Sequence, residues 1–246
     1  MTLIVVPTYD EALTVGDLLD RLLSEPGLAG AHVLVVDDGS PDGTAAIVRS
    51  HAQAGTRVHL LERPAKEGLG PAYRAGFGWA RDHGFETVVQ MDADGSHPVD
   101  AVPRLLSRLD EADLVIGSRY VPGGRTVDWP WRRRLVSRAG NAYVRLVLGL
   151  PVHDATAGFR AFGPAALDVL AQGRTHADGY SFQIETTWCV ARAGLRVAEE
   201  PITFVERRAG RSKMSTAIAV EALWRVLEWR IGAGRATPRH ALEGVA

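Results

Sequence analysis

The 246-residue sequence predicts an α/β fold in which a mainly parallel sheet lies between two layers of helices. Two observations carry this prediction. Short runs of almost wholly apolar residues alternate along the chain with longer stretches that have the 3.6-residue period of amphipathic helices. The apolar runs also lack the alternation of a half-exposed strand, which is typical of strands buried on both faces. Alternating strands and helices imply right-handed crossovers and parallel pairing.

The expected strands lie where short apolar runs end in loops of proline, glycine or aspartate. They cover residues 3–6, 32–36, 58–61, 87–91 and 113–117, a short strand that begins near residue 160, and a region over 196–204 that Pro201 interrupts. The expected helices cover residues 13–25, 44–54, 73–83, 102–109, 132–150, 167–172, 183–193 and 216–231. Residues 1–231 are therefore expected to form one domain, with a mobile flap over 121–131 and a disordered tail over 232–246.

The composition, with 46% apolar and 23% charged residues, is that of an ordinary soluble protein. The single cysteine, Cys189, excludes an internal disulfide and fits a reducing compartment. The sequence shows no signal peptide and no run of the roughly 20 apolar residues that a membrane span needs. We therefore expect a cytoplasmic protein, peripheral at the cytoplasmic face of any membrane that it contacts.

Charge is balanced over the whole chain, with 28 basic and 29 acidic residues, and so gives no indication of nucleic-acid binding. Locally it is uneven: residues 119–145 hold seven arginines and one acid, and residues 204–240 hold eight basic residues and three acids. An acidic first half that faces a basic second half suits an anionic substrate with a bridging cation. Two solvated surfaces are the simpler alternative.

An acidic turn follows the expected strand 87–91. Asp92 and Asp94 are one residue apart, and alternate side chains of an extended segment point to the same side. Gly95 and Pro98 then favour a turn. Two carboxylates at the end of a strand suit a hard divalent cation, Mg²⁺ or Mn²⁺, that could hold the phosphates of a nucleotide. A solvated acidic turn is the alternative.

Three acidic or polar loops are expected at one edge of the sheet, because ligands of such folds bind at the carboxyl ends of parallel strands. These loops carry Tyr9 and Glu11, then Asp37 and Asp38, then the Asp92–Asp94 turn. The glycine signatures of dinucleotide-binding and P-loop proteins, G-x-G-x-x-G and G-x-x-x-x-G-K, are absent from the sequence. A Rossmann dehydrogenase and a P-loop kinase are therefore disfavoured.

Six short motifs occur in order along the chain. They are P-T-Y-D-E (7–11), V-D-D-G-S-P-D-G-T (36–44), G-L-G-P-A-Y (68–73), D-A-D-G-S-H-P (92–98), G-S-R-Y (117–120) and R-x-x-G-x-S-K (207–213). Together they span nearly the whole chain, and the sequence resembles the GT-A glycosyltransferases of family 2. Within that family it is most similar to the dolichyl and polyprenyl phosphate mannosyltransferases.

The resemblance implies a GT-A fold, the Rossmann-like three-layer α/β/α arrangement of nucleotide-diphospho-sugar transferases. It implies inverting transfer of mannose from GDP-mannose to a polyprenyl monophosphate, with Mg²⁺ or Mn²⁺. The residues expected to contact the nucleotide are Pro7, Tyr9, Glu11, Val36 and Asp38. Those expected to hold the metal and diphosphate are Asp92, Ala93, Asp94 and Ser96. Those expected to receive phosphates of donor and acceptor are Arg119, Arg133, Arg207 and Lys213.

Three departures from the family pattern stand out. Asp10 occupies a position where asparagine is usual, and Gly95 replaces a usual leucine, which is expected to loosen the metal turn. The sequence also lacks the carboxy-terminal membrane spans of some relatives. Membrane contact is therefore expected to rest on the amphipathic stretches 132–150 and 216–231, unless these pack on the domain, or on a separate membrane-anchoring subunit.

Two other functions are compatible with the residues. A family 2 transferase that uses UDP-glucose or another nucleotide sugar would keep the same fold and metal. A non-catalytic module that binds nucleotide sugars is less compatible, because such a module has no need of cations for an acceptor phosphate.

Overall fold

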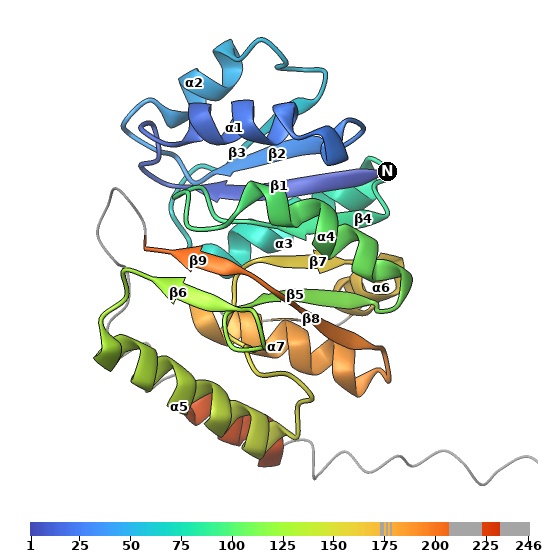
Figure 1. The fold of residues 1–246 in the computed structure, drawn as a ribbon. Coiled ribbons are helices and arrows are strands. Elements are labelled where there is room, and N and C mark those ends of the chain that lie inside the picture. Colours follow the sequence, from blue (N-terminus) through green and yellow to red (C-terminus); the bar gives the residue numbers. More distant parts are fainter. Residues whose placement is uncertain (173–174, 176, 178, 207–222, 232–246) are drawn as a thin grey trace, which may run out of the picture.

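A seven-stranded sheet forms the centre of the molecule, with strand order β3-β2-β1-β4-β7-β5-β8 (Figure 1). The structure is a computed structural model and describes residues 1–172, 175, 177, 179–206 and 223–231. The strands are β1 (Thr2–Thr8), β2 (His32–Asp37), β3 (Val58–Glu62), β4 (Thr87–Gln90), β5 (Leu114–Ser118), β7 (Arg160–Phe162) and β8 (Val197–Pro201). All neighbouring pairs are parallel except those made by β7, which is antiparallel to both β4 and β5. The expectation of a mainly parallel sheet is confirmed.

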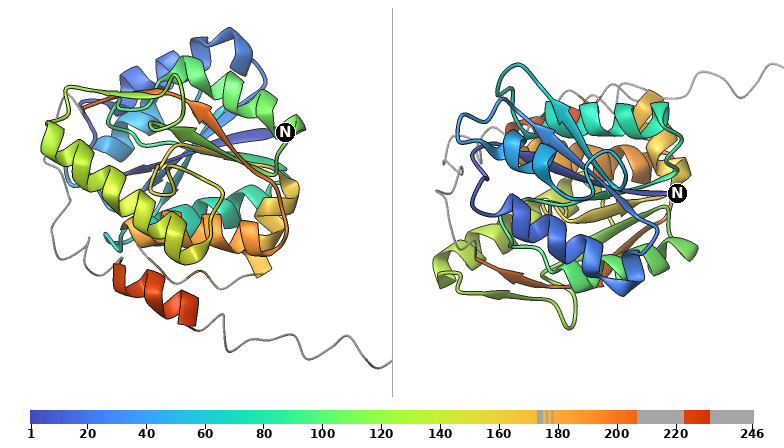
Figure 2. Two further views of the ribbon diagram at one scale, coloured as in Figure 1. Left: turned by 60° about the horizontal axis from the view of Figure 1, so that its bottom comes forward. Right: turned by 90° about the horizontal axis from the view of Figure 1, so that it is seen from above.

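Helices cover both faces of this sheet, as the two views in Figure 2 show. One face carries α1 (Val15–Ser24), α2 (Thr44–Ser50) and α4 (Val102–Ser107), and the other carries α3 (Leu69–Asp82), α6 (Pro164–Gln172) and α7 (Gly179–Arg192). Short 3₁₀ turns occupy Pro26–Leu28, Val99–Ala101 and Arg108–Asp110. Because strands of a covered sheet are apolar on both sides, Ile4 faces the first layer while Val5 faces the second. Gly76 of α3 packs so closely that a Cβ there would lie 2.5 Å from Val5.

A second sheet of two strands lies beside the first. β6 (Arg125–Val127) pairs in parallel with β9 (Thr203–Val205), which follows β8 after a break at Ile202. The expected mobile flap over 121–131 is therefore wrong in part, because its middle is held in a sheet. The prediction missed the pairing because the two partner segments are far apart in the sequence. Pro201 does interrupt the strand region, as expected.

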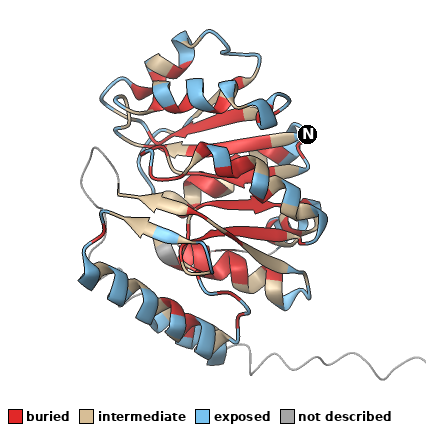
Figure 3. Cartoon of the chain, in the orientation of Figure 1, coloured by how far each residue is buried: buried red, intermediate tan, exposed pale blue. Residues whose placement is uncertain are grey.

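Helix α5 (Trp131–Leu148) lies along the side of the molecule near β6, and helical residues 223–231 lie next to it (Figure 1). The Tyr143 hydroxyl donates a hydrogen bond to the Leu223 carbonyl at 3.2 Å. Figure 3 shows that buried residues fill the central strands, whereas α5 is mostly exposed. The sequence pattern of 132–150 predicts an apolar face that includes Leu135, Tyr143, Leu146 and Val147. This prediction is wrong in part: Tyr143 and Val147 pack against the core, but Leu135 and Leu146 are exposed, while Asn141 and Val144 are buried.

Several predicted boundaries also need correction. The helix expected over 44–54 ends at Ser50, and the helix expected over 73–83 begins at Leu69 because Gly68 supplies the turn before it. Leu13, expected on the apolar face of the first helix, is 89% exposed in the loop before α1. The basic loop 207–213, residues 216–222 of the last expected helix and the tail 232–246 lie outside the described residues.

Three histidines gather with aromatic rings at the end of the sheet opposite the acidic loops. Nδ1 of His32 and Nε2 of His59 are 3.0 Å apart, and their rings stack with centres separated by 5.3 Å. Trp79 contacts His59 and stacks on His83. Burial lowers the pKa of His59 below 6.5, and the neighbouring His32 and His83 lower it further. The folded protein therefore binds a proton at His59 less readily than the unfolded chain does.

This difference predicts a loss of stability in acid. Above pH 6.5 His59 is mostly neutral in both the folded and the unfolded chain, so it does not change the free energy of unfolding. Below pH 6.5 the unfolded chain binds a proton at His59 more readily than the folded protein does, so stability falls as the pH drops towards the lower folded-state pKa. We expect the Tm of the wild type to fall more between pH 7.5 and 5.5 than the Tm of a His59→Gln variant. Thermal denaturation of both proteins at several pH values across this range measures the two falls in Tm. His153→Gln, at a histidine that contacts Glu199, should leave the acid-induced drop in place. Parallel curves for the wild type and His59→Gln would contradict the prediction.

Candidate active site

The carboxyl ends of β1, β2, β4 and β5 lie on the left in Figure 1, at one edge of the sheet. The first two loops at this edge are held together by Asp37. Its carboxylate accepts hydrogen bonds from the Thr8 hydroxyl at 2.9 Å, the Ser40 hydroxyl at 2.6 Å and the Ser40 amide at 2.9 Å. The Ser40 hydroxyl accepts in turn from the Asp10 amide at 3.1 Å. Asp37 therefore links the end of β1 to the loop that follows β2.

Asp42 is a second residue whose hydrogen bonds link the same two loops. Its carboxylate accepts from the Ala12 amide at 2.9 Å and from the amide and hydroxyl of Thr44, whose own hydroxyl accepts from the Glu11 amide. Although burial raises it, these hydrogen bonds lower the pKa of Asp42 overall. Asp10 lies in the loop that these hydrogen bonds to Asp37 and Asp42 hold in place. It has a φ of 60°, a conformation that aspartate and asparagine tolerate better than most residues. The backbone thus accounts for the residue type at this position.

The predicted nucleotide residues line this part of the edge. The ring of Tyr9 lies 3.9 Å beneath the ammonium group of Lys66, and the carboxylate of Asp38 accepts from Arg63 at 2.6 Å. Burial raises the pKa of Asp38 above its usual value, although Arg63 opposes the shift. The loop from Arg63 to Gly68 therefore forms one wall of the site. The side chain of Val36 is fully buried, so only its backbone could contact a nucleotide.

The predicted metal turn follows β4. The Asp94 carboxylate accepts from the Ser96 amide at 3.0 Å, and Asp94 itself is nearly buried while Asp92 is partly exposed. Gly95 has a φ of +73°, where a leucine would be strained, so this glycine fits the turn. The positive φ at this position accounts for the presence of glycine, whereas the expectation that Gly95 loosens the turn does not.

A divalent cation fits this turn chemically. The buried Ser96 hydroxyl has no hydrogen-bond partner within the described part of the chain, and it lies in the same turn as two carboxylates. Among the described residues, no group of three or more His, Cys, Asp or Glu side chains could hold a metal. Mg²⁺ and Mn²⁺ are commonly held by one or two carboxylates with substrate phosphates and water. Asp92 and Asp94, with Ser96, are such a set.

Sequence reasoning found the motif that contains Tyr73 but assigned the residue no role. This tyrosine lies in α3, is completely buried, and its hydroxyl is 3.3 Å from Oδ1 of Asp92. Burial raises the pKa of Tyr73 well above its usual value, and the Asp92 carboxylate raises it further. The hydroxyl therefore stays protonated and can donate to Asp92.

Arg119, predicted to receive a phosphate, is held by a buried carboxylate. Its Nε and Nη2 donate to the two oxygens of Asp154 at 2.7 and 2.6 Å, and its backbone amide donates to the same carboxylate at 3.0 Å. Both side chains are almost fully buried. Removing one partner of such a pair typically costs about 3–5 kcal/mol, so Asp154 fixes where Arg119 lies. The sequence gave no signal for this pairing, because the partners are separated by 35 positions.

Arg133, the second predicted phosphate residue, lies near Arg119. Its guanidinium is 4.0 Å from the centre of the Trp129 ring, and that of Arg119 is 5.3 Å from the same centre. Arg133 also forms an ion pair with Glu206. The structure therefore brings these two cations together around one tryptophan. Arg207 and Lys213, the other two predicted cations, lie outside the described residues.

Strand β9 connects this basic region to the metal turn. The Val205 amide donates to the Ser96 carbonyl at 3.3 Å. The ring of Phe204 meets the edge of His97 on one side and Trp129 on the other, at centre distances of 5.6 and 5.4 Å. The acidic turn and the arginines around Trp129 are thus connected through the packing of β9.

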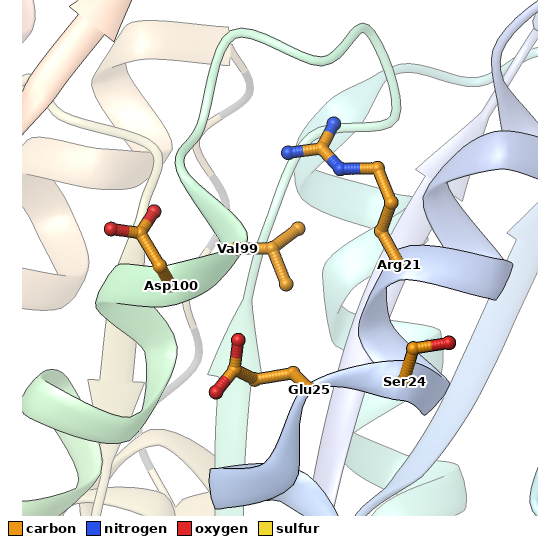
Figure 4. Close-up of a pocket in the computed structure, with 5 residues that line it drawn as sticks. All are labelled: Arg21, Ser24, Glu25, Val99 and Asp100. Atoms are coloured by element: carbon orange, nitrogen blue, oxygen red, sulfur yellow. The ribbon is translucent and has the colours of Figure 1, made fainter.

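A cavity of ≈ 310 Å³ opens elsewhere, between the end of α1 and the 3₁₀ turn at Val99 (Figure 4). Figure 4 shows the carboxylates of Glu25 and Asp100 and the guanidinium of Arg21 around Val99. None of the residues that line it belongs to the predicted site. This cavity therefore lies apart from the carboxyl edge of the sheet, where the predicted site residues that the structure describes are found.

Comparisons with known proteins agree with this geometry. The profile of the family described as "Glycosyl transferase family 2" matches residues 3–170. The chain is 46% identical over 232 residues to the polyprenol monophosphomannose synthase of Mycolicibacterium smegmatis, covering 94% of this chain and 87% of that protein. It is also 46% identical over 231 residues to the undecaprenyl-phosphate mannosyltransferase of Micrococcus luteus, covering 94% of each.

Solved structures support the fold. The glucosyl-3-phosphoglycerate synthase of Mycobacterium tuberculosis in complex with phosphoglyceric acid superposes with a TM-score of 0.68 at 22% identity, over 94% of this chain and 80% of that one. The same enzyme with Mn²⁺ and UDP-glucose gives a TM-score of 0.67 at 21% identity, over 94% of this chain and 79% of that one. The expected GT-A-like α/β fold is confirmed. From the matched profile and the two close relatives, we conclude that the chain is an enzyme and belongs to glycosyltransferase family 2.

Proposed function

We propose that this enzyme transfers mannose from GDP-mannose to a polyprenyl monophosphate with inversion at the anomeric carbon. The two relatives at 46% identity are named for polyprenol monophosphomannose synthesis and undecaprenyl-phosphate mannosyl transfer. The observation that carries the proposal is the contact between the two halves of the site. β9 joins the acidic turn at Ser96 to the arginines around Trp129, so a donor diphosphate and an acceptor phosphate could lie side by side.

In this proposal each half of the site has its own substrate. Pro7, Tyr9, Glu11, Asp38 and the backbone of Val36 bind the nucleoside, while Asp92, Ala93, Asp94 and Ser96 face the diphosphate. A Mg²⁺ or Mn²⁺ ion held by Asp92, Asp94 and Ser96 would neutralise charge on the departing diphosphate. Arg119, Arg133, Arg207 and Lys213 bind the phosphates of donor and acceptor. These side chains suit this task because they are positively charged at neutral pH and each carries several N–H donors.

The reaction then needs little proton transfer. A phosphate monoester has a second pKa of about 6, so near neutral pH the acceptor is largely a dianion. One of its oxygens forms a bond to the anomeric carbon as the bond from that carbon to the nucleotide breaks, and GDP leaves with the electron pair. The chain's main contributions are orientation and charge stabilisation. Direct attack inverts the centre, so an α-linked donor gives a β-linked product.

UDP-glucose is the second candidate donor. The glucosyl-3-phosphoglycerate synthase of similar fold has been solved with Mn²⁺ and UDP-glucose. Its identity of 21% to this chain supports a common fold alone, whereas the mannosyl-transferring relatives are 46% identical. GDP-mannose is therefore the better proposal.

A donor screen tests the reaction. The purified chain, with Mg²⁺ or Mn²⁺ and a polyprenyl phosphate, should form labelled lipid from GDP-mannose and little from UDP-glucose. Asp94→Ala should reduce transfer by at least about a hundredfold, because it removes a carboxylate proposed to hold the cation that stabilises the departing diphosphate. Asp100→Ala, an exposed carboxylate six positions further on, should transfer at nearly the wild-type rate. Preference for UDP-glucose would replace the proposed donor, and near-normal turnover by Asp94→Ala would contradict the metal assignment.

We further propose that the enzyme works at the cytoplasmic face of a membrane, through a surface formed by α5 and helical residues 223–231. A polyprenyl tail leaves a bilayer only at great cost, since each buried CH₂ is worth about 0.8 kcal/mol. In the described residues, no helix combines the length and the apolar character that crossing a membrane requires. The acceptor phosphate would therefore be met at the headgroups.

The composition of this surface supports the proposal. Its exposed apolar side chains are Trp131, Leu135, Val136 and Leu146 of α5, with Leu223, Trp224, Leu227 and Ile231 of the neighbouring helix. Residues 131–150 contain five arginines and no acid, which suits anionic lipid. Tryptophan and arginine are the side chains expected at an interface. The expected helix 216–231 carries two tryptophans suited to an interface: Trp224 is exposed, whereas Trp229 stacks on Trp188 at 5.9 Å and so packs on the domain.

Liposome co-sedimentation tests the surface. The full chain should sediment with anionic vesicles at low salt and less so at high salt, because salt screens exposed charges. Trp131→Glu combined with Leu146→Glu should weaken sedimentation. Leu13→Glu, at an apolar residue that is also exposed but lies in the loop before α1, should not. If the wild type stays in solution with anionic vesicles that carry acceptor, the surface does not suffice, and a separate membrane-anchoring subunit must bring the enzyme to its lipid.

A further inference from the structure

We propose that Tyr73 and His97 are positioning residues that orient the Asp92 carboxylate towards a divalent cation. The inference rests on the metal role that the proposed function gives to Asp92 and Asp94. It assigns tasks to two motifs, G-L-G-P-A-Y and D-A-D-G-S-H-P, whose tyrosine and histidine have no part in the proposed chemistry. Neither residue is expected to touch the substrate, because both are buried behind the turn.

Tyr73 of α3 donates a hydrogen bond to one carboxylate oxygen of Asp92. Its hydroxyl is 3.3 Å from Oδ1 of Asp92 and reaches it from α3, on the far side of β4 from α4. The ring is fully buried and stacks on Phe182, with centres 5.9 Å apart and planes 4° from parallel. A ring packed in this way has a single orientation, so its hydroxyl is a fixed hydrogen-bond donor.

His97 holds the backbone of the same residue. The Asp92 amide donates to Nδ1 of His97 at 3.1 Å, which requires this nitrogen to act as an acceptor and places the ring proton on Nε2. Nε2 lies 3.9 Å from Oδ2 of Asp92, too long for a hydrogen bond but close enough for electrostatic attraction. The two residues thus approach the two oxygens of Asp92 separately.

The histidine ring cannot turn away from Asp92. It is 3% exposed, stacks on Phe159 at 5.0 Å, and meets Phe204 edge to face at 5.6 Å. Gly158 closes the remaining side, since a Cβ there would lie 3.4 Å from Oδ2 of Asp92 and 3.8 Å from Cε1 of His97. Three separate segments, α3, the metal turn and the loop before β7, therefore fix this one carboxylate.

Asp94 is held in a different way, by the Ser96 amide within its own turn. Asp92 is thus contacted by the side chain of Tyr73 from α3 and that of His97 from the end of the turn, whereas Asp94 accepts a hydrogen bond from the backbone of its own turn. Residues that orient a metal ligand usually change metal affinity about 10- to 100-fold when they are replaced. Such an effect is measurable without catalysis.

The test measures the dissociation constant of Mn²⁺ by electron paramagnetic resonance, on the full chain with GDP. Tyr73→Phe removes only the hydroxyl, and His97→Leu removes both nitrogens while keeping much of the volume. We expect each to weaken Mn²⁺ binding by about 10- to 100-fold. His97→Asn restores an acceptor near the position of Nδ1 and should recover part of the loss. Tyr143→Phe, which removes a hydroxyl that bonds to Leu223, is the matched control and should bind Mn²⁺ like the wild type.

Transfer assays over a range of Mn²⁺ separate positioning from folding. The rate of Tyr73→Phe should approach the wild-type rate at saturating Mn²⁺, which an unfolded or distorted chain would not show. If Tyr73→Phe and His97→Leu both bind Mn²⁺ like the wild type while Asp94→Ala does not, the positioning proposal is overturned and the metal site stands. If the wild type and Asp94→Ala bind Mn²⁺ equally, the metal site and this inference both fall. Should His97→Leu not fold, Tyr73→Phe and His97→Asn decide the question.

Discussion

The direction of β7 is the constraint on which the site depends. Parallel strands bring their carboxyl ends to one edge of the sheet, and β1, β2, β4 and β5 therefore deliver their loops there. β7 runs the other way between β4 and β5, so its amino end lies at that same edge. The loop that precedes it carries Asp154, which holds Arg119, and Gly158, which lies against Asp92. A parallel strand in that place would put this loop at the opposite edge.

Charge at the site is arranged in pairs. Arg119 is matched by Asp154, Arg133 by Glu206, and Asp38 by Arg63. Unpaired buried charges are costly, so a region that gathers several arginines also needs acids to pair with them. The fully buried Arg160 beneath the site follows a related rule. Burial lowers its pKa to about 9, and its guanidinium donates to the carbonyls of Ala155, Ala157 and Gln183.

Much of this arrangement could be predicted from the sequence because the signals are local. Apolar runs such as residues 3–6 identify buried strands, and Asp92 and Asp94 are separated in the chain by Ala93 alone. The order of the strands could not be predicted, since nothing local indicates that β7 lies between β4 and β5. The pairing of β6 with β9 was missed for the same reason, because each strand has three residues and its partner is distant.

Errors in the amphipathic helices have a different cause. The helical period of α5 was predicted correctly, but the face that packs was predicted only in part, because Asn141 is buried and bonds Thr156 while Leu146 is exposed. A sequence pattern identifies two faces without saying which one meets the protein. The role of His97 was also out of reach, because a ring's tautomer depends on the partner of its other nitrogen.

Phe204 has a further consequence, which concerns how the two halves of the site influence each other. Its ring contacts His97, beside the acidic turn, and Trp129, beside the two arginines. In the proposed function the two substrates would bind on either part of this row, with Phe204 packed between the residues that meet them. If the binding of one substrate changes the affinity for the other, the second must change the affinity for the first by the same factor. The row His97, Phe204 and Trp129 is the packed connection through which such a linkage would pass.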